Sequence, residues 1–296
     1  MPFLFAATQY RVENCIEITG FAGKVRILTV PDEIEGLPVR SIGRNAFTAR
    51  RDLEEISLPP TVRKLSRFAF HNCGSLKKMR LYDGVEDYSD GAVRQCGALE
   101  EIELIMRGDS YALMKEMLEG NDHAVSFRLR LPSEEILLSF PDYALIASEN
   151  TMARTIQFAY EGGGYAYRQC VRKKEIRYRE YDRLFPFMEH DDPSFAAVIA
   201  TDRLMFPHDL NDAARERYTS FLRAHAKEAM DRFIVRGQIE RVRLVTEMGL
   251  ADADAISKSL VTASNKKETA ICAVLMESGR QAARKPQTLS LELEDW

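Results

Sequence analysis

A period of 23 residues runs through the first third of the chain and constrains its fold more than any other feature. Leu53, Leu76 and Leu99 are each 23 residues apart, and five further columns keep the same spacing. Those columns are Val39/Val62/Val85, Ile42/Leu65/Tyr88, Ala46/Ala69/Ala92, Phe47/Phe70/Val93 and Leu58/Leu81/Leu104. Fixed periods of 20 to 50 residues are typical of solenoids, in which similar units stack.

Each unit carries a short strand and a tighter turn. The alternation of Ile56 and Leu58 has the two-residue period of a strand, whereas the Ala69-Phe70 pair fits a more helical turn. One such coil cannot bury its apolar side alone, so neighbouring coils must stack. The pattern predicts a short right-handed solenoid with a parallel sheet on one face.

The repeat unit resembles a known bacterial family. It reads Leu53-x-x-Ile56-x-Leu58-Pro59-x-x-Val62-x-x-Leu65-x-x-x-Ala69-Phe70-x-x-Cys73-x-x-Leu76, preceded by the entry segments 18–24 and 30–43. This unit is similar to BspA-like bacterial leucine-rich repeats over roughly residues 10–105. The resemblance implies a protein-binding solenoid, of a kind often displayed at the cell surface in relatives.

Charged residues occupy the outward positions of the repeat strands. Successive strands present Glu55, then Lys78, then Glu101, so opposite charges face each other on adjacent coils. Such pairs either keep an open face soluble or form a patterned docking strip. The predicted partner-binding residues on this strip are Glu55, Ser57, Lys78, Arg80, Glu101 and Glu103.

The cysteines and the start of the chain favour a reducing location. The five cysteines are odd in number and scattered, without a C-x-x-C pair. Cys73 and Cys96 occupy equivalent positions on successive coils, where they form either a packing pair or a disulfide. The apolar start lacks a basic leader, and no window reaches the roughly 18 apolar residues of a membrane helix. We therefore expect a cytoplasmic protein.

The repeat gives way to other elements after Leu104. Residues 110–118 read as a short helix with Ser110 as cap and Gly120 as stop, and residues 125–131 alternate as one more strand. The expected organisation is an α+β chain whose solenoid is followed by a mostly α-helical domain. The domains are a solenoid with its closing unit at 1–133, a transitional β-hairpin region at 134–170, a helical domain at 171–279 and a flexible tail at 280–296.

The helical half shows caps, stops and apolar stripes. Asp192-Pro193 starts one helix, a second begins near Asn211 or Asp209 and continues to Gly237 with His225 on its buried stripe, and another ends at Gly279. The last short helices weakly resemble ankyrin-type hairpins, because Gly237 and Asn265 are 28 residues apart.

We find no motif that carries catalysis. Gly162-Gly163-Gly164 lacks the Lys-Ser/Thr of a phosphate loop and reads as a flexible turn. The histidines form no metal-binding spacing, so no cofactor or metal is expected. The chain carries 41 Lys+Arg against 45 Asp+Glu, a net charge of −4, which does not favour nucleic acid or anionic membranes as partners.

The resulting hypothesis is a non-catalytic protein-interaction scaffold whose partner binds the exposed solenoid sheet. Two alternatives stay open. One is an enzyme with a pocket within residues 134–279. The other is a nucleic-acid contact through the basic and aromatic stretch 168–183.

Overall fold

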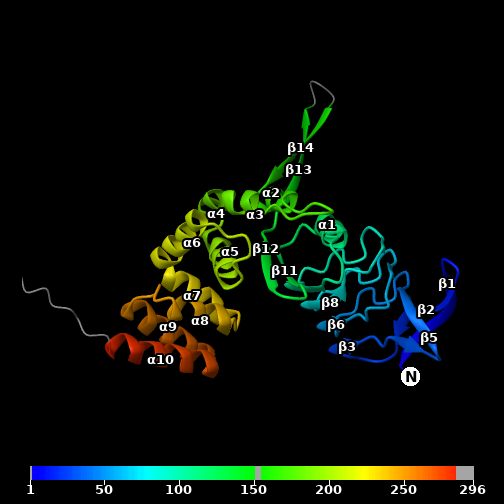
Figure 1. The fold of residues 1–296 in the computed structure, drawn as a ribbon, viewed down its shortest axis with the longest axis horizontal. Helices are drawn as coiled ribbons and strands as arrows, with labels where there is room; N and C mark the ends of the chain where they lie inside the picture. Colours follow the sequence, from blue (N-terminus) through cyan, green and yellow to red (C-terminus); the bar gives the residue numbers. More distant parts are fainter. Residues whose placement is uncertain (1, 151–154, 285–296) are drawn as a thin grey trace, which may run out of the picture. The chain divides into compact units, whose positions relative to one another are not determined.

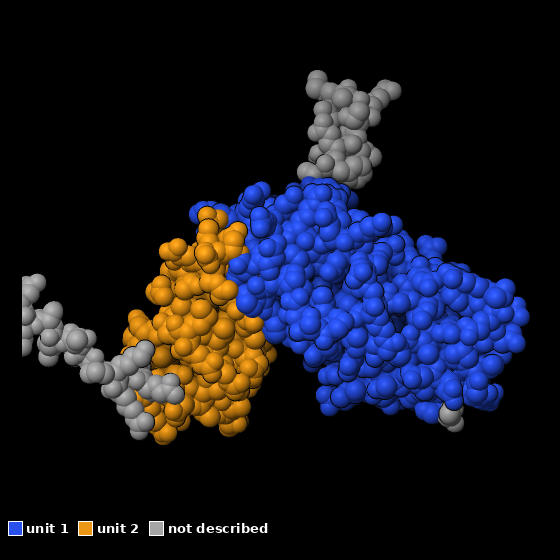
Figure 2. All heavy atoms as spheres, viewed as in Figure 1, with its two compact units in different colours: residues 1–192, 206–210 blue, residues 193–205, 211–296 orange. Residues whose placement is uncertain are grey.

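A computed structural model describes residues 2–150 and 155–284, and divides the chain into two compact units. Unit 1 comprises residues 1–192 and 206–210, and unit 2 comprises residues 193–205 and 211–296 (Figure 2). This division reflects which segments pack against one another and does not test which of them fold independently. The domain boundaries at 133, 170 and 279 therefore stay a prediction about which parts fold alone.

Unit 1 is built on two sheets of stacked coils (Figure 1). The first sheet has the order β1-β2-β5-β7-β9, with β4 paired to β5. Its strands are β1 (Phe3–Tyr10), β2 (Glu13–Phe21), β4 (Glu33–Ile34), β5 (Leu37–Ile42), β7 (Lys64–Leu65) and β9 (Asp87–Tyr88). β1 and β2 form an antiparallel pair, and β2, β5, β7 and β9 run parallel. The short-strand ladder β5-β7-β9 is not among the predicted features.

The second sheet contains the predicted repeat strands and has the order β12-β11-β10-β8-β6-β3. Its strands are β3 (Ile27–Thr29), β6 (Glu55–Ser57), β8 (Lys78–Tyr82), β10 (Glu101–Ile105), β11 (Val125–Arg130) and β12 (Glu135–Phe140). All pairs from β3 to β11 are parallel. The predicted solenoid with a parallel sheet is confirmed.

The repeated apolar columns form the solenoid core. The column Leu53/Leu76/Leu99 is at most 2% exposed. The rings of Phe47 and Phe70 stack with centroids 5.2 Å apart and an angle of 2° between them. Because each coil presents the same side chains to its neighbours, one apolar pattern fills the whole interior.

Two backbone positions in each coil adopt left-handed geometry. Asn45, Phe68 and Gly91 have φ of 59°, 61° and 77°, and Ala49, Asn72 and Gln95 have φ of 59°, 58° and 62°. Both triplets keep the 23-residue spacing. These positions bend the chain between the two sheets, where main-chain groups such as Phe47 N and Ala69 O bond from coil to coil at 2.8 Å.

The solenoid ends through α1 (Ala112–Glu119), β11 and β12. The predicted short helix and strand are present, and the C-cap of α1 is Gly120. Tyr111 holds the N-cap position, but the capping side chain is that of Ser110, whose Oγ accepts from Ala112 N at 3.3 Å. The apolar run at 136–138 is a further strand, β12, which pairs antiparallel with β11. The sheet therefore continues past residue 133.

A hairpin and three short helices complete unit 1. The hairpin consists of β13 (Ala144–Asn150) and β14 (Thr155–Glu161), and it projects from the solenoid flank (Figure 1). The helices are α2 (Gly164–Gln169), α3 (Tyr178–Arg183) and α4 (Phe185–Asp191). Gly162 and Gly163 form the predicted turn between β14 and α2, whereas Gly164 begins α2 and is tightly packed: it is buried, and a Cβ there would lie 2.2 Å from the carbonyl oxygen of Pro141.

Unit 2 is helical and contains α5 (Pro193–Met205), α6 (Asp212–Ala224), α7 (Ala226–Val235), α8 (Ile239–Glu247), α9 (Ala253–Lys266) and α10 (Thr269–Arg284). Asn211 caps α6, since its Oδ1 accepts from Ala214 N at 2.8 Å. The expected single helix to Gly237 is wrong, because the chain leaves helical geometry at His225, which is exposed. α6 packs on α5, whereas α7 packs mainly on α8 and α9 and only to a lesser extent on α5, so the two segments follow different neighbours and do not form one continuous helix.

The last helix is longer than the sequence pattern predicts. α10 continues through Gly279 to Arg284, into the segment expected to be tail. A single glycine costs a helix only about 1 kcal/mol, and the following Arg280-Gln281-Ala282-Ala283 favours helix. The rest of the predicted tail, residues 285–296, lies outside the described residues.

Candidate functional site

The predicted docking strip lies in the expected register on the second sheet. Glu55 pairs with Lys78, and Lys78 pairs with Glu101. In the neighbouring row, Ser57 pairs with Arg80, and Arg80 pairs with Glu103. Neighbouring strands in a sheet are about 4.8 Å apart, so the six side chains form two parallel rows, in which the charge alternates except at the neutral Ser57.

The rows continue into charges that sequence reasoning left out. Arg128 on β11 pairs in register with Glu103, and Arg130 pairs with Glu135 on β12. The signal was available, because residues 125–131 are predicted as a strand, whose two-residue period puts both arginines on one face. What the pattern did not show was the strand β12, which places Glu135 beside both.

Ion pairs link these side chains into one continuous network. Glu101 lies 2.8 Å from Lys78 and 3.1 Å from Arg128, measured between nitrogen and oxygen atoms. Glu103 contacts Arg130 and lies 3.8 Å from Arg80. Glu135 joins the two arginines, since it contacts Arg128 and lies 2.9 Å from Arg130. The charges at this end of the face are thus compensated within the protein.

Burial divides the strip into two parts. Glu103 is only 4% exposed, which corrects its predicted place on an exposed face. The outward positions of β12 are covered too: Ser139 is buried, and the hydroxyl of Tyr181 donates to its carbonyl oxygen at 2.5 Å. Phe206, from the segment 206–210 of unit 1, lies 5.6 Å from the guanidinium of Arg128.

The part that remains open lies over β3, β6 and β8. Glu55 is exposed, and the side chains of Lys78 and Arg80 are 42% and 47% exposed. Ile27, in register with Glu55, is 64% exposed and adds an apolar position to the row. We call Ile27, Glu55, Ser57, Lys78 and Arg80 the open face.

The structure gives less support to the two alternatives, a nucleic-acid contact and an enzyme pocket. In the stretch 168–183, Tyr178 and Tyr181 are buried and cannot stack on bases, and Arg177 pairs with Glu175 and Glu180. In unit 2 a cavity of about 480 Å³ lies among residues of α6, α7 and α9, including Lys227, Asp252 and Asp254. Within the described ranges, no three His, Cys, Asp or Glu side chains gather as a metal site, and no helix is long and apolar enough to cross a membrane.

The repeat region matches a known family of leucine-rich repeats. Residues 29–118 match the family model described as "BspA type Leucine rich repeat region", in 6 copies. The resemblance predicted from the 23-residue unit is confirmed. Leucine-rich repeats of this type suggest a module for protein interaction.

Solved structures of bacterial leucine-rich repeat proteins also match. The T. pallidum Leucine Rich Repeat protein is 30% identical, with a TM-score of 0.32, over 35% of this chain and 50% of that one. A leucine-rich repeat protein from Bacteroides ovatus ATCC 8483 is 25% identical, with a TM-score of 0.30, over 36% of this chain and 30% of that one. A leucine-rich cell surface protein from Faecalibacterium prausnitzii A2-165 is 21% identical, with a TM-score of 0.30, over 39% and 33%.

The chain therefore spans half the length of the first of these proteins and about a third of the other two. No curated protein matches the sequence.

Proposed function

We propose that this protein is a non-catalytic interaction module that binds a protein partner through the open face of its solenoid sheet. The observation that carries the proposal is the contrast along one sheet. Glu103 and Arg128 are largely buried within the ion-pair network. Lys78 and Arg80 also form ion pairs, but their side chains stay 42% and 47% exposed, beside Glu55 and the apolar Ile27.

A rigid array of this kind suits protein recognition. The parallel ladder holds the side chains at fixed spacing, so little conformational entropy is lost when a partner binds. Polar and charged groups arranged around an apolar contact give an interface its orientation and its association rate.

The test compares two lysines in the same structural setting. Lys78 pairs with Glu101 on the next coil of the second sheet at 2.8 Å, and Lys64 pairs with Asp87 on the next coil of the first sheet at 3.1 Å. Tagged wild type, the double variant K78E/R80Q and the control K64E would each be exposed to a lysate of the source organism. Captured proteins would be quantified by mass spectrometry, after circular dichroism has verified the fold of each variant.

A protein retained by the wild type and K64E but lost by K78E/R80Q supports the open face as the docking surface. Equal retention by all three would remove the interaction from this face. Failure to retain any protein would argue against the interaction role itself and return attention to an enzymatic alternative.

We further propose that the interaction takes place in the cytoplasm. The support is the cysteines: Cys15, Cys73, Cys96 and Cys170 are buried as free thiols, as expected in a reducing compartment. Fractionation of the source organism with an antibody against the protein tests the location, and a surface or secreted signal would refute it.

A further inference from the structure

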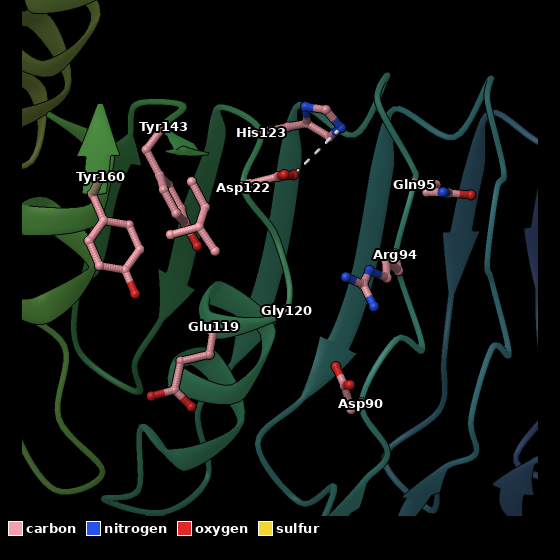
Figure 3. A pocket seen from close by; sticks show the side chains of 10 residues that line it. Asp90, Arg94, Gln95, Glu119, Gly120, Asp122, His123, Tyr143 and Tyr160 are labelled. Atoms are coloured by element: carbon pink, nitrogen blue, oxygen red, sulfur yellow. Dashed lines mark ion pairs between the residues drawn. The ribbon is translucent and has the colours of Figure 1, made fainter. Parts of the chain in front are cut away.

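A second feature of unit 1 lies away from the docking face. A cavity of about 580 Å³ opens between the solenoid flank and the base of the β13–β14 hairpin (Figure 3). This size falls within the range of about 300–1,000 Å³ that is usual for small-ligand sites. Its lining residues are Asp90, Arg94, Gln95, Glu119, Gly120, Asp122, His123, Tyr143, Leu145 and Tyr160.

A buried arginine fixes the walls of this cavity. Arg168 is 4% exposed and donates hydrogen bonds to the main-chain carbonyl oxygens of Asn121 (3.0 Å), Pro141, His123 (2.7 Å) and Gly164 (3.0 Å). Burial lowers its pKa to about 10, which still leaves it protonated. One side chain thus ties together the two loops that carry Asp122, His123 and Tyr143, and a site held in this way is preorganised.

Aromatic rings line one side. The guanidinium of Arg168 lies 4.9 Å from the Tyr143 ring centroid, so this ring is supported from within the protein. Tyr165 stacks on Tyr160 at 3.6 Å with 8° between the rings, and Tyr160 is still 49% exposed. Figure 3 shows Tyr143 and Tyr160 on the side of the cavity opposite Arg94 and Gln95.

The polar side chains of the cavity carry charges of both signs, and most of them make few or no hydrogen bonds or ion pairs with other described side chains. Within the described part of the chain, the side chains of Asp90, Arg94 and Gln95 make no hydrogen bond or ion pair. Asp122 has only a 3.7 Å ion-pair contact with the exposed His123. This is the reverse of the compensated network around Glu103.

The mixture of groups selects the chemistry of a ligand. An anion would face the carboxylates of Asp90 and Asp122, and also that of Glu119, which pairs with Lys115 at 2.5 Å. A lone cation would meet Arg94, with Arg168 behind the tyrosine wall. A neutral molecule rich in hydroxyl groups suits both signs, because each hydroxyl donates to a carboxylate and accepts from a guanidinium or an amide. If such a molecule is cyclic, the apolar C–H face of its ring also packs on an aromatic side chain.

We propose that this cavity is a carbohydrate-binding site, with Tyr160 as the stacking platform and Asp90, Arg94 and Asp122 as hydrogen-bonding groups. The site is independent of the open face and goes beyond the proposed protein interaction.

The test uses four neutral probes, maltotetraose, cellotetraose, xylotetraose and chitotetraose, with the full chain. Binding is detected by saturation-transfer NMR and quantified by calorimetry. We expect at least one probe to bind, and Tyr160→Ala to weaken it about tenfold through loss of the platform. Tyr10→Ala is the matched control, since Tyr10 ends the edge strand β1, four strands away from β9 in the first sheet.

Asp122→Asn serves as a second variant that keeps the size of the side chain and spares the hairpin, and it too should weaken binding. The affinity should stay constant between about 50 and 500 mM NaCl, because the ligand carries no charge. The proposal is overturned if none of the four probes binds, if both variants bind like the wild type, or if the affinity falls with salt as for an ionic ligand.

Discussion

The Sγ atom of Cys96 lies 3.0 Å from the main-chain carbonyl oxygen of Phe70, to which it donates a hydrogen bond. One coil earlier, Cys73 makes the same bond to Phe47, also at 3.0 Å. Both thiols are free and buried, so each links its own coil to the preceding one. Of the two interpretations of this cysteine pair, the structure shows the packing one.

These contacts predict the order in which the cysteines react. The neighbouring Cys96 thiol and burial raise the pKa of Cys73, and burial raises the pKa of Cys170 to about 12. Iodoacetamide at about pH 8 should therefore modify the partly exposed Cys272 first. The buried thiols should react only after unfolding, because burial keeps the reagent away from all of them, including Cys96, whose pKa is lowered by its hydrogen bond with Cys73. Mass spectrometry of timed samples checks this order. Rapid modification of Cys73 in the native protein would contradict it.

The burial of Glu103 predicts a large difference between two charge reversals on one face. Glu103→Lys would place a cation between Arg80 and Arg130, and we expect a loss of about 3–5 kcal/mol in the free energy of unfolding. Lys78→Glu changes an accessible side chain and should cost about 1 kcal/mol or less. Urea denaturation followed by circular dichroism measures both. Similar losses in the two variants would show that Glu103 is not the anchor of the network.

The same network predicts an acid-sensitive contribution to stability. Burial alone would raise the pKa of Glu101, but the hydrogen bond from Arg128 and the ion pair with Lys78 outweigh it and hold the pKa below its ordinary 4.5. A carboxylate with a lowered pKa in the folded state stabilises the protein above its unfolded pKa and loses this effect as the pH falls through the folded value.

The midpoint of urea denaturation should accordingly show no contribution from Glu101 titration between pH 7 and about pH 5, and it should decline below about pH 4.5. The variant Glu101→Gln removes the titrating group, so its decline in this window should be shallower than that of the wild type. Parallel curves for the two proteins would show that Glu101 contributes nothing to acid sensitivity.

Close backbone packing at Gly164 predicts intolerance to a single methyl group. A Cβ at Gly164 would lie 2.2 Å from the carbonyl oxygen of Pro141 and 2.4 Å from that of Asp142. Because main chain cannot yield as a flexible side chain does, we expect Gly164→Ala to cost about 3 kcal/mol. Gly74→Ala is the control, since nothing lies within 4 Å of its added Cβ. A thermal shift for Gly164→Ala no larger than that of the control would refute the packing argument.

The left-handed position at Ala49 predicts a stabilising substitution. Ala49 has φ of 59°, a conformation that costs an L-residue about 1–2 kcal/mol and glycine nothing. Ala49→Gly should raise the melting temperature, whereas Ala69→Gly, at a buried repeat position without positive φ, should lower it. Differential scanning calorimetry on both variants measures the direction of the change in melting temperature. A lower melting temperature for Ala49→Gly would contradict the prediction.

The solenoid could be predicted from the sequence because its determinants repeat. Stacking places residue i against residue i+23, so one period reveals both the buried column at Leu53 and the register of Glu55 with Lys78. The left-handed turns were harder to find, since only Asn45, Asn72 and Gly91 are residue types typical of positive φ, whereas Ala49, Phe68 and Gln95 at the equivalent positions are not.

The candidate sites were less predictable because they depend on distant segments. Glu103 is buried through Arg130 and strand β12, and Arg128 is covered by Phe206, more than seventy residues away in the chain. The cavity beside Tyr160 requires the loop at Asp122, the coil at Asp90 and the hairpin at once. Neither arrangement leaves a period or a motif in the sequence.

The two sheets are ended by antiparallel strands at opposite ends of the coil stack: β1 and β2 begin the first sheet, and β12 finishes the second. The coils between them all present the same pair of parallel edges, so a coil gained or lost by recombination between repeats would leave both ends with the neighbours they need. The row of side chains on the open face would grow or shrink by one step with each event. The reach of this surface can thus change in units of one coil, and the cavity beside the hairpin is kept as long as the coil that carries Asp90 and Arg94 is retained.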